Sequence, residues 1–141
     1  MNLKLILRIV LPFLISFSSV AQRFAIIGDY GVDNSNELEV SQLVKNWNPE
    51  FILTVGDNNY GRGEDSTIDV NIGKYYSDYI HPYKGDFGSG SGTIKFFPSP
   101  GNHDYYTDEG RPYCNYFELP GNERYYEFIR GDIHFFSLNS N

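Results

Sequence analysis

Three stretches of similar design constrain this chain most, because each places polar side chains directly after an apolar run. The apolar runs are residues 24–27, 51–55 and 94–97, and the stretches that follow them are residues 28–31, 56–60 and 101–104. Each stretch has a glycine that lets the backbone turn sharply after a strand. Ligands of open α/β sheets bind at the carboxyl ends of the strands. We therefore expect three buried strands whose loops supply half or more of a two-metal hydrolytic site.

The rest of the chain alternates between strand-like and helix-like patterns, which predicts an α/β fold. Residues 23–55 have the pattern of one strand–helix–strand unit. By the rule that such units cross over with a right hand, we expect its two strands to be parallel. The expected elements are strands at 23–27, 51–55 and 93–97, helices at about 35–47 and 68–80, an irregular aromatic loop over the site at 105–122, and a hairpin of strands 125–130 and 133–138. Gly131-Asp132 is the two-residue turn expected for that hairpin.

The first helix carries the usual start and stop signals. Ser35 or Asn36 is expected to cap it, and Asn48-Pro49 is expected to end it. Its apolar residues recur at helical spacing: Leu38, Val40, Leu43, Val44 and Trp47.

Composition excludes one class of partner. The chain has 141 residues, enough for one domain, and a formal net charge of −7. Binding to a nucleic acid backbone needs clustered Lys and Arg, and the sequence has no basic run of that kind. A nucleic acid is therefore not an expected partner.

The first 21 residues have the pattern of a secretory signal peptide. Lys4 and Arg8 make a positive start, an apolar run follows at 9–17, and small residues precede a cleavage site after Ala21. The run is shorter than the roughly 20 apolar residues of a membrane-spanning helix, so no stable membrane anchor is expected. The sequence predicts a secreted or periplasmic protein with its domain at residues 22–141.

Two further features have ordinary interpretations. Cys114 is the single cysteine, so it cannot form a disulfide within this chain, and we expect a buried apolar filler. Residues 85–92 are rich in glycine, but they lack the Lys-Ser/Thr of a phosphate-binding loop and no helix follows directly. We expect a flexible linker there.

The donors of the three loops suit hard metal ions. Carboxylate and carboxamide oxygens bind such cations, and two cations about 3.5–4 Å apart can clamp both oxygens of a phosphoryl displacement. Asp57, in the middle loop, is the natural bridging ligand, with Asp29 and Asn102 on the outer sides. Tyr60 would become a ligand only beside a strong Lewis acid such as ferric iron. Each of these residues alone is common in turns or in packing. The hypothesis of a metal site therefore depends on their occurring together.

The motifs Gly-Asp-x-Gly, Gly-Asp-x-x-Tyr and Gly-Asn-His-Asp, in this order after apolar strands, resemble the first three motifs of the calcineurin-like metallophosphoesterases. The tyrosine makes the chain most similar to the purple acid phosphatases. The resemblance implies that Asp29 and Tyr60 hold a ferric ion, Asp57 bridges, and Asn102 holds a second ion of zinc, manganese or iron. It places His103 beside the leaving group. It also implies hydrolysis of phosphomonoesters, and hence a small phosphorylated substrate. The fold that it implies is a four-layer α/β/β/α sandwich, of which this chain is the first half.

The chain departs from that family in its histidines. The family's Val-x-x-His and Gly-His-x-His motifs are absent, and we expect His81 and His134 to be surface or packing residues. The chain thus resembles the amino-terminal half of an enzyme and is expected to be inactive alone. The alternatives are an inactive remnant of the family, or a non-catalytic exported domain whose aromatic segment 105–117 binds a partner or glycan.

Overall fold

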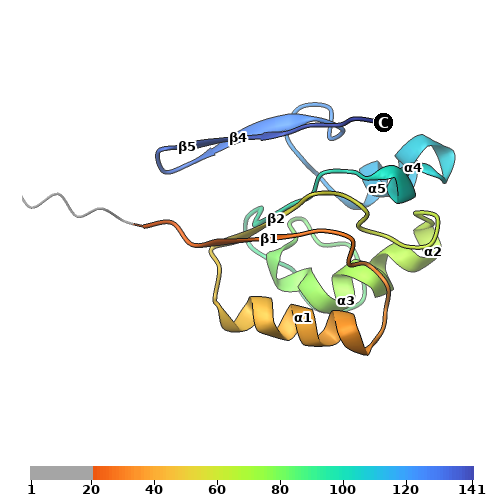
Figure 1. The fold of residues 1–141 in the computed structure, drawn as a ribbon, viewed down its shortest axis with the longest axis horizontal. Helices are drawn as coiled ribbons and strands as arrows, with labels where there is room; N and C mark the ends of the chain where they lie inside the picture. The colour runs from red at the N-terminus through yellow and green to blue at the C-terminus, as the bar shows by residue number, and fades with distance from the viewer. Residues whose placement is uncertain (1–20) are drawn as a thin grey trace, which may run out of the picture.

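The computed structural model describes residues 21–141, which form three layers (Figure 1). A hairpin lies on one face of a parallel sheet, and helices cover the other face. The expected α/β fold is confirmed, with an arrangement that fits a fragment of an α/β/β/α sandwich. The predicted signal peptide falls almost wholly in residues 1–20, outside the described part of the chain. No helix within residues 21–141 is long and apolar enough to cross a membrane.

The central sheet sets the position of the site. Its strands are β1 (Phe24–Ile27), β2 (Phe51–Thr54) and β3 (Phe96–Phe97), in the order β1-β2-β3 and all parallel. The pairing is parallel, as predicted, and it brings the loops after all three strands to one edge. β3 is shorter than expected, because its pairing with β2 extends only over Ile52 and Leu53.

The second sheet is the expected hairpin of β4 (Tyr126–Arg130) and β5 (Ile133–Ser137). Gly131 turns it with a positive φ of 54°, which glycine adopts without steric cost. Aromatic rings join the two sheets: Phe128 stacks on Phe97 and meets Phe51 edge-on. This aromatic layer fixes the hairpin over the strands that lead into the site.

The first helix, α1 (Ser35–Asn46), differs from expectation in two respects. Its cap is Asn34, whose side chain accepts hydrogen bonds from the backbone of Asn36 and Glu37. The apolar residues at helical spacing are also mostly exposed, and only Val44 among them is buried in the core. The helix instead buries a face that includes Glu37 and Ser41.

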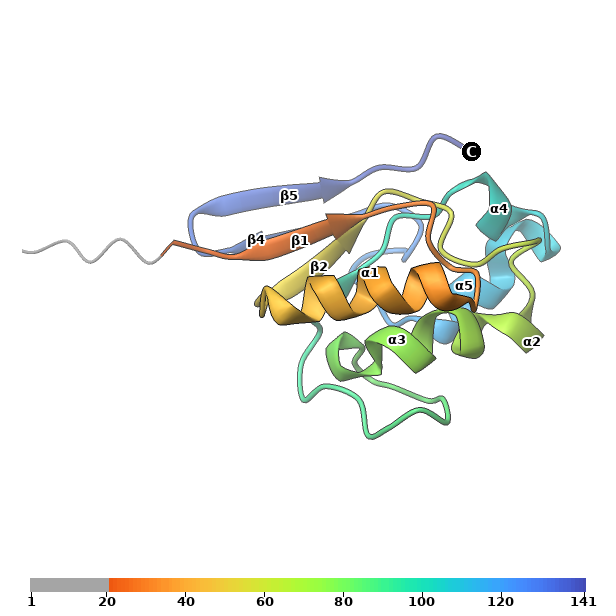
Figure 2. The same cartoon turned by 60° about the horizontal axis from the view of Figure 1, so that its bottom comes forward.

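A second helical stretch lies beside α1 on the same face of the sheet (Figure 2). It runs through α2 (Asp65–Ile68), η1 (Asp69–Gly73), α3 (Lys74–Tyr76) and η2 (Ser77–Tyr79). It therefore begins three residues before the predicted start, and η1 is a single wider π-type turn. Its core residues include Ile72 and Tyr76, both fully buried.

The aromatic segment 105–122, expected to be an irregular loop, is largely helical. It contains the end of α4 (Asn102–Tyr105), then η3 (Asp108–Gly110) and α5 (Arg111–Tyr116). Pro112 occupies the first turn of α5, where it has no hydrogen bond to lose. Tyr113 and Phe117 are buried, and the Tyr113 hydroxyl donates to the Pro98 carbonyl at 2.6 Å. The segment is thus part of the core, with few aromatic side chains left for a partner or glycan.

Candidate metal centre

The loops after the three strands are packed directly against one another. The Asp29 amide donates to the Gly56 carbonyl at 3.1 Å, and the Tyr60 amide donates to the Gly31 carbonyl at 2.8 Å. A Cβ at position 101 would lie 2.2 Å from the Asp57 nitrogen, so only glycine permits this approach. The close contact of three glycine-containing loops is what brings the candidate residues together.

The two aspartates of these loops meet at a shared tyrosine. Asp29 and Asp57 have positive φ angles of 54° and 53°, conformations that Asp tolerates better than most residues. The Tyr60 hydroxyl lies 3.0 Å from Asp29 Oδ1 and 3.0 Å from Asp57 Oδ2. Three oxygen donors from two strand-end loops therefore face one point.

This cluster lacks a positive charge. Neither Asp29 nor Asp57 forms an ion pair within residues 21–141, and the single phenol proton of Tyr60 can satisfy only one carboxylate at a time. Partial burial, and then the hydrogen bonds to both carboxylates, raise the pKa of Tyr60 above its ordinary value. The donor set is hard, anionic and uncompensated, which fits a metal cation.

His103 adjoins the same cluster. Its backbone amide donates to Asp57 Oδ1 at 3.0 Å, and its ring lies 4.3 Å from the Tyr60 ring. The ring Nδ1 lies 2.7 Å from the Gly61 carbonyl oxygen, which can only accept, so Nδ1 carries the proton. Nε2 is therefore the ring nitrogen that remains free to form a hydrogen bond with a substrate.

Asn102 lies beside this cluster without touching the carboxylates. It stands between Gly101 and His103, both of which contact Asp57. Its side-chain amide, however, donates to the Tyr106 hydroxyl at 2.8 Å. To act as a ligand, the Asn102 carboxamide oxygen would have to be the atom that faces the centre.

Asp104 is the residue that the sequence analysis missed. It is 1% exposed, and its carboxylate accepts from the backbone of Asn58, Asn59 and Gly101 and from the Asn58 side chain. Burial raises its pKa, against the effect of these hydrogen bonds. The carboxylate thus ties the loop after β2 to the loop after β3. The only available signal was an acidic residue that closes the third motif.

Residues 21–141 contain no group of three or more His, Cys, Asp or Glu side chains that could hold a metal ion. His81 and His134 are surface residues, as expected: His81 Nδ1 lies 2.7 Å from the Ser91 carbonyl, and His134 Nε2 lies 3.1 Å from Glu127. Cys114 is partly buried and packs against the core. The described donors are therefore two carboxylates, one phenol and one carboxamide.

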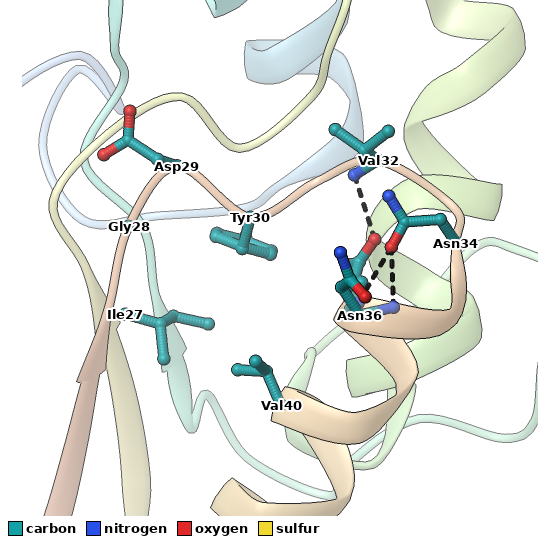
Figure 3. Close-up of a pocket in the computed structure, with 9 residues that line it drawn as sticks. Ile27, Gly28, Asp29, Tyr30, Val32, Asn34, Asn36 and Val40 are labelled. Carbon is teal, nitrogen blue, oxygen red and sulfur yellow. Dashed lines mark hydrogen bonds between the residues drawn. The ribbon is translucent and has the colours of Figure 1, made fainter.

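A cavity of about 380 Å³ lies on the other side of the loop after β1 (Figure 3). Tyr30, Ile27 and Val40 line it, and Asp29 lines it too, although its carboxylate points away from the other lining side chains. The cavity therefore adjoins the metal centre at Asp29, whereas the other candidate ligands do not line it. Glu37 also lines it; the side chain accepts from the Val32 amide through Oε2, and its Oε1 is buried without a partner among residues 21–141.

Replacing Glu37 by glutamine should remove a pH dependence of stability. Burial raises the pKa of Glu37 from 4.5 to about 8, with a smaller increase from Asp33 and opposing effects from the Val32 hydrogen bond and Lys74. The folded state then holds a proton that the unfolded state releases, so stability falls as pH rises from about 4.5 to 8. Between pH 5 and 8.5, we expect Glu37→Gln to gain about 3 kcal/mol relative to the parent in urea unfolding. The exposed Glu39→Gln serves as control, and a gain that does not vary with pH would contradict the assignment.

The α/β fold and the oxygen donors of this cluster fit a metal-dependent hydrolase domain. A model of the calcineurin-like phosphoesterase family matches residues 22–140, nearly the whole chain. The chain belongs to this family, whose members generally use a pair of divalent metal ions. No curated protein matches the chain.

Proposed function

We propose that this chain is part of an exported phosphoesterase of the purple acid phosphatase type, which hydrolyses phosphomonoesters at a dinuclear metal site. The observation that carries the proposal is the Tyr60 hydroxyl, 3.0 Å from a carboxylate oxygen of both Asp29 and Asp57. A phenol placed between two uncompensated carboxylates suits ferric iron, which can displace the phenol proton. The second ion would be zinc, manganese or iron.

The residues divide into ligands and a proton donor. Asp57 would bridge the ions, Asp29 and Tyr60 would hold the iron, and Asn102 would hold the second ion once its oxygen faces inward. When bound, such a pair supplies Lewis acidity that activates water and offsets the charge of the phosphoryl group. His103, fixed by the Gly61 carbonyl, presents Nε2; in its protonated form it donates to the leaving oxygen.

Hydrolysis of an aryl phosphate by the full-length protein tests the proposal. Activity should disappear with a strong chelator and return when iron plus zinc or manganese is restored. The purple type also predicts a visible absorption band from tyrosinate bound to iron, which Tyr60→Phe should abolish. Chelator-resistant turnover would contradict the metal dependence, and an active but colourless protein would reject the purple type.

Export rests on the sequence of the first 21 residues. Signal peptidase cleavage after Ala21 would leave Gln22 as the first residue of the mature protein. An exported enzyme would meet small phosphorylated compounds outside the cytoplasm, which agrees with a site formed at an exposed loop edge.

A further inference from the structure

Arg62 differs from the other arginines of the described chain. Its guanidinium donates no hydrogen bond and forms no ion pair within residues 21–141. Every other arginine there donates to a carbonyl, hydroxyl or carboxylate: Arg23, Arg111, Arg124 and Arg130. Arg62 is also exposed, on a chain whose net charge is −7. A cation without a partner on an acidic protein is available to an anionic ligand.

The backbone of Arg62 is held against the metal-centre loops. Its carbonyl accepts from Thr107 Oγ1 at 2.7 Å, and its amide donates to Glu64 Oε2 at 3.2 Å. A Cβ on the next residue, Gly63, would lie 2.8 Å from the carbonyl oxygens of His103 and Asp104. The loop therefore lies tightly on the third motif, and Arg62 cannot move away from it without breaking these contacts.

The side chain of Arg62 is directed by Tyr106. The guanidinium carbon lies 5.4 Å from the centre of the Tyr106 ring, a cation–π contact. The other neighbours of Tyr106 belong to the candidate centre: its ring lies 5.0 Å from the His103 ring, and its hydroxyl accepts from Asn102. Tyr106 thus joins Arg62 to the side of the centre where His103 stands.

We propose that Arg62 forms a subsite for a second anionic group, carried by the leaving group of the substrate. This inference rests on the proposed function, because His103 marks the leaving-group side of the centre only if it donates the proton there. A guanidinium binds a phosphate or phosphonate through paired N–H donors, and the N–H donors of Arg62 are free for this purpose within residues 21–141. The site would therefore favour phosphoryl compounds whose leaving group carries a charge, such as diphosphates, over phosphoesters with a neutral leaving group.

The test uses the metal-loaded full-length protein and two uncleavable probes. Calorimetric titration compares methylenediphosphonate, which carries a second anionic group, with methylphosphonate, which does not. Arg62→Gln should weaken binding of methylenediphosphonate about tenfold and that of methylphosphonate less than about threefold, the range of one charge contact near the surface. Arg62→Lys should fall between, since lysine keeps the charge but not the paired donors.

The matched control is Arg23→Gln, the same change of charge at the amino end of β1, away from the loop edge. It should leave both affinities unchanged. The proposal is overturned if Arg62→Gln weakens both probes equally, weakens neither, or has the same effect as Arg23→Gln. A parent protein that binds methylenediphosphonate no more tightly than methylphosphonate would overturn it as well.

A kinetic comparison separates this inference from the proposed function. The quantity compared is kcat/KM for pyrophosphate divided by kcat/KM for phenyl phosphate. This ratio should be about tenfold lower in Arg62→Gln than in the parent enzyme. If the protein hydrolyses neither compound, the proposed function fails. The two titrations still decide whether Arg62 binds the second anionic group.

Discussion

In the full-length protein, Asp57→Asn should abolish phosphoester hydrolysis while leaving the protein folded. Asp57 presents Oδ2 to the Tyr60 hydroxyl and Oδ1 to the His103 amide, so its carboxylate lies at the centre of the cluster. An amide has one oxygen and no charge, and cannot bridge two cations as a carboxylate does. We expect kcat/KM for an aryl phosphate to fall at least about 1000-fold, a loss of about 4 kcal/mol of transition-state stabilisation.

Stability gives the second measurement for this variant. Without metal, the substitution relieves repulsion between Asp29 and Asp57, but it places an amide NH₂ against one of the two donors that face Asp57. These effects oppose each other, so urea unfolding in chelator should give a free energy within about 1 kcal/mol of the parent. Asp132→Asn, in the exposed hairpin turn, is the matched control and should keep full activity. Equal rates for parent and Asp57→Asn would show that the bridging role is wrong.

The sequence predicted the parts of the fold that short-range chemistry decides. Glycines after apolar runs indicated where strands end, and parallel pairing then required the loops of β1, β2 and β3 to share an edge. The convergence of Asp29, Asp57 and Tyr60 follows from that topology together with the close packing of the loops. The Gly131-Asp132 turn likewise determined the hairpin, because two residues suffice to reverse the chain there.

The remaining features depend on neighbours distant in sequence. The spacing of apolar residues in α1 predicted the helix correctly, but which side is buried depends on the layer beneath it, and Glu37 and Ser41 lie there instead. The aromatic segment 105–122 has an irregular pattern, and the sequence therefore predicts a loop there. Contacts of Tyr113 and Phe117 with the core stabilise a helix there.

Asp104→Ala is expected to cost the largest amount of stability of any single change at the site. The carboxylate is almost fully buried, and it satisfies the backbone N–H groups of Asn58, Asn59 and Gly101. Alanine offers no acceptor, so these donors stay buried without partners, and the loops after β2 and β3 lose their connection. Unsatisfied buried donors and a lost charge-assisted network together should destabilise the protein by about 3–5 kcal/mol.

Urea unfolding measures this loss, with Asp78→Ala as the control. Asp78 is also an aspartate with an ion-pair partner, Lys45, but its side chain is 75% exposed, so its removal should cost less than about 0.5 kcal/mol. Asp104→Asn keeps the shape and one acceptor, but turns an NH₂ toward the donors of Asn58, so an intermediate loss is expected. If Asp104→Ala costs no more than Asp78→Ala, the hydrogen bonds of Asp104 do not hold the two loops together. Another interaction, such as the packing of Gly101 on Asp57, would then have to fix the distance between Asp57 and Asn102.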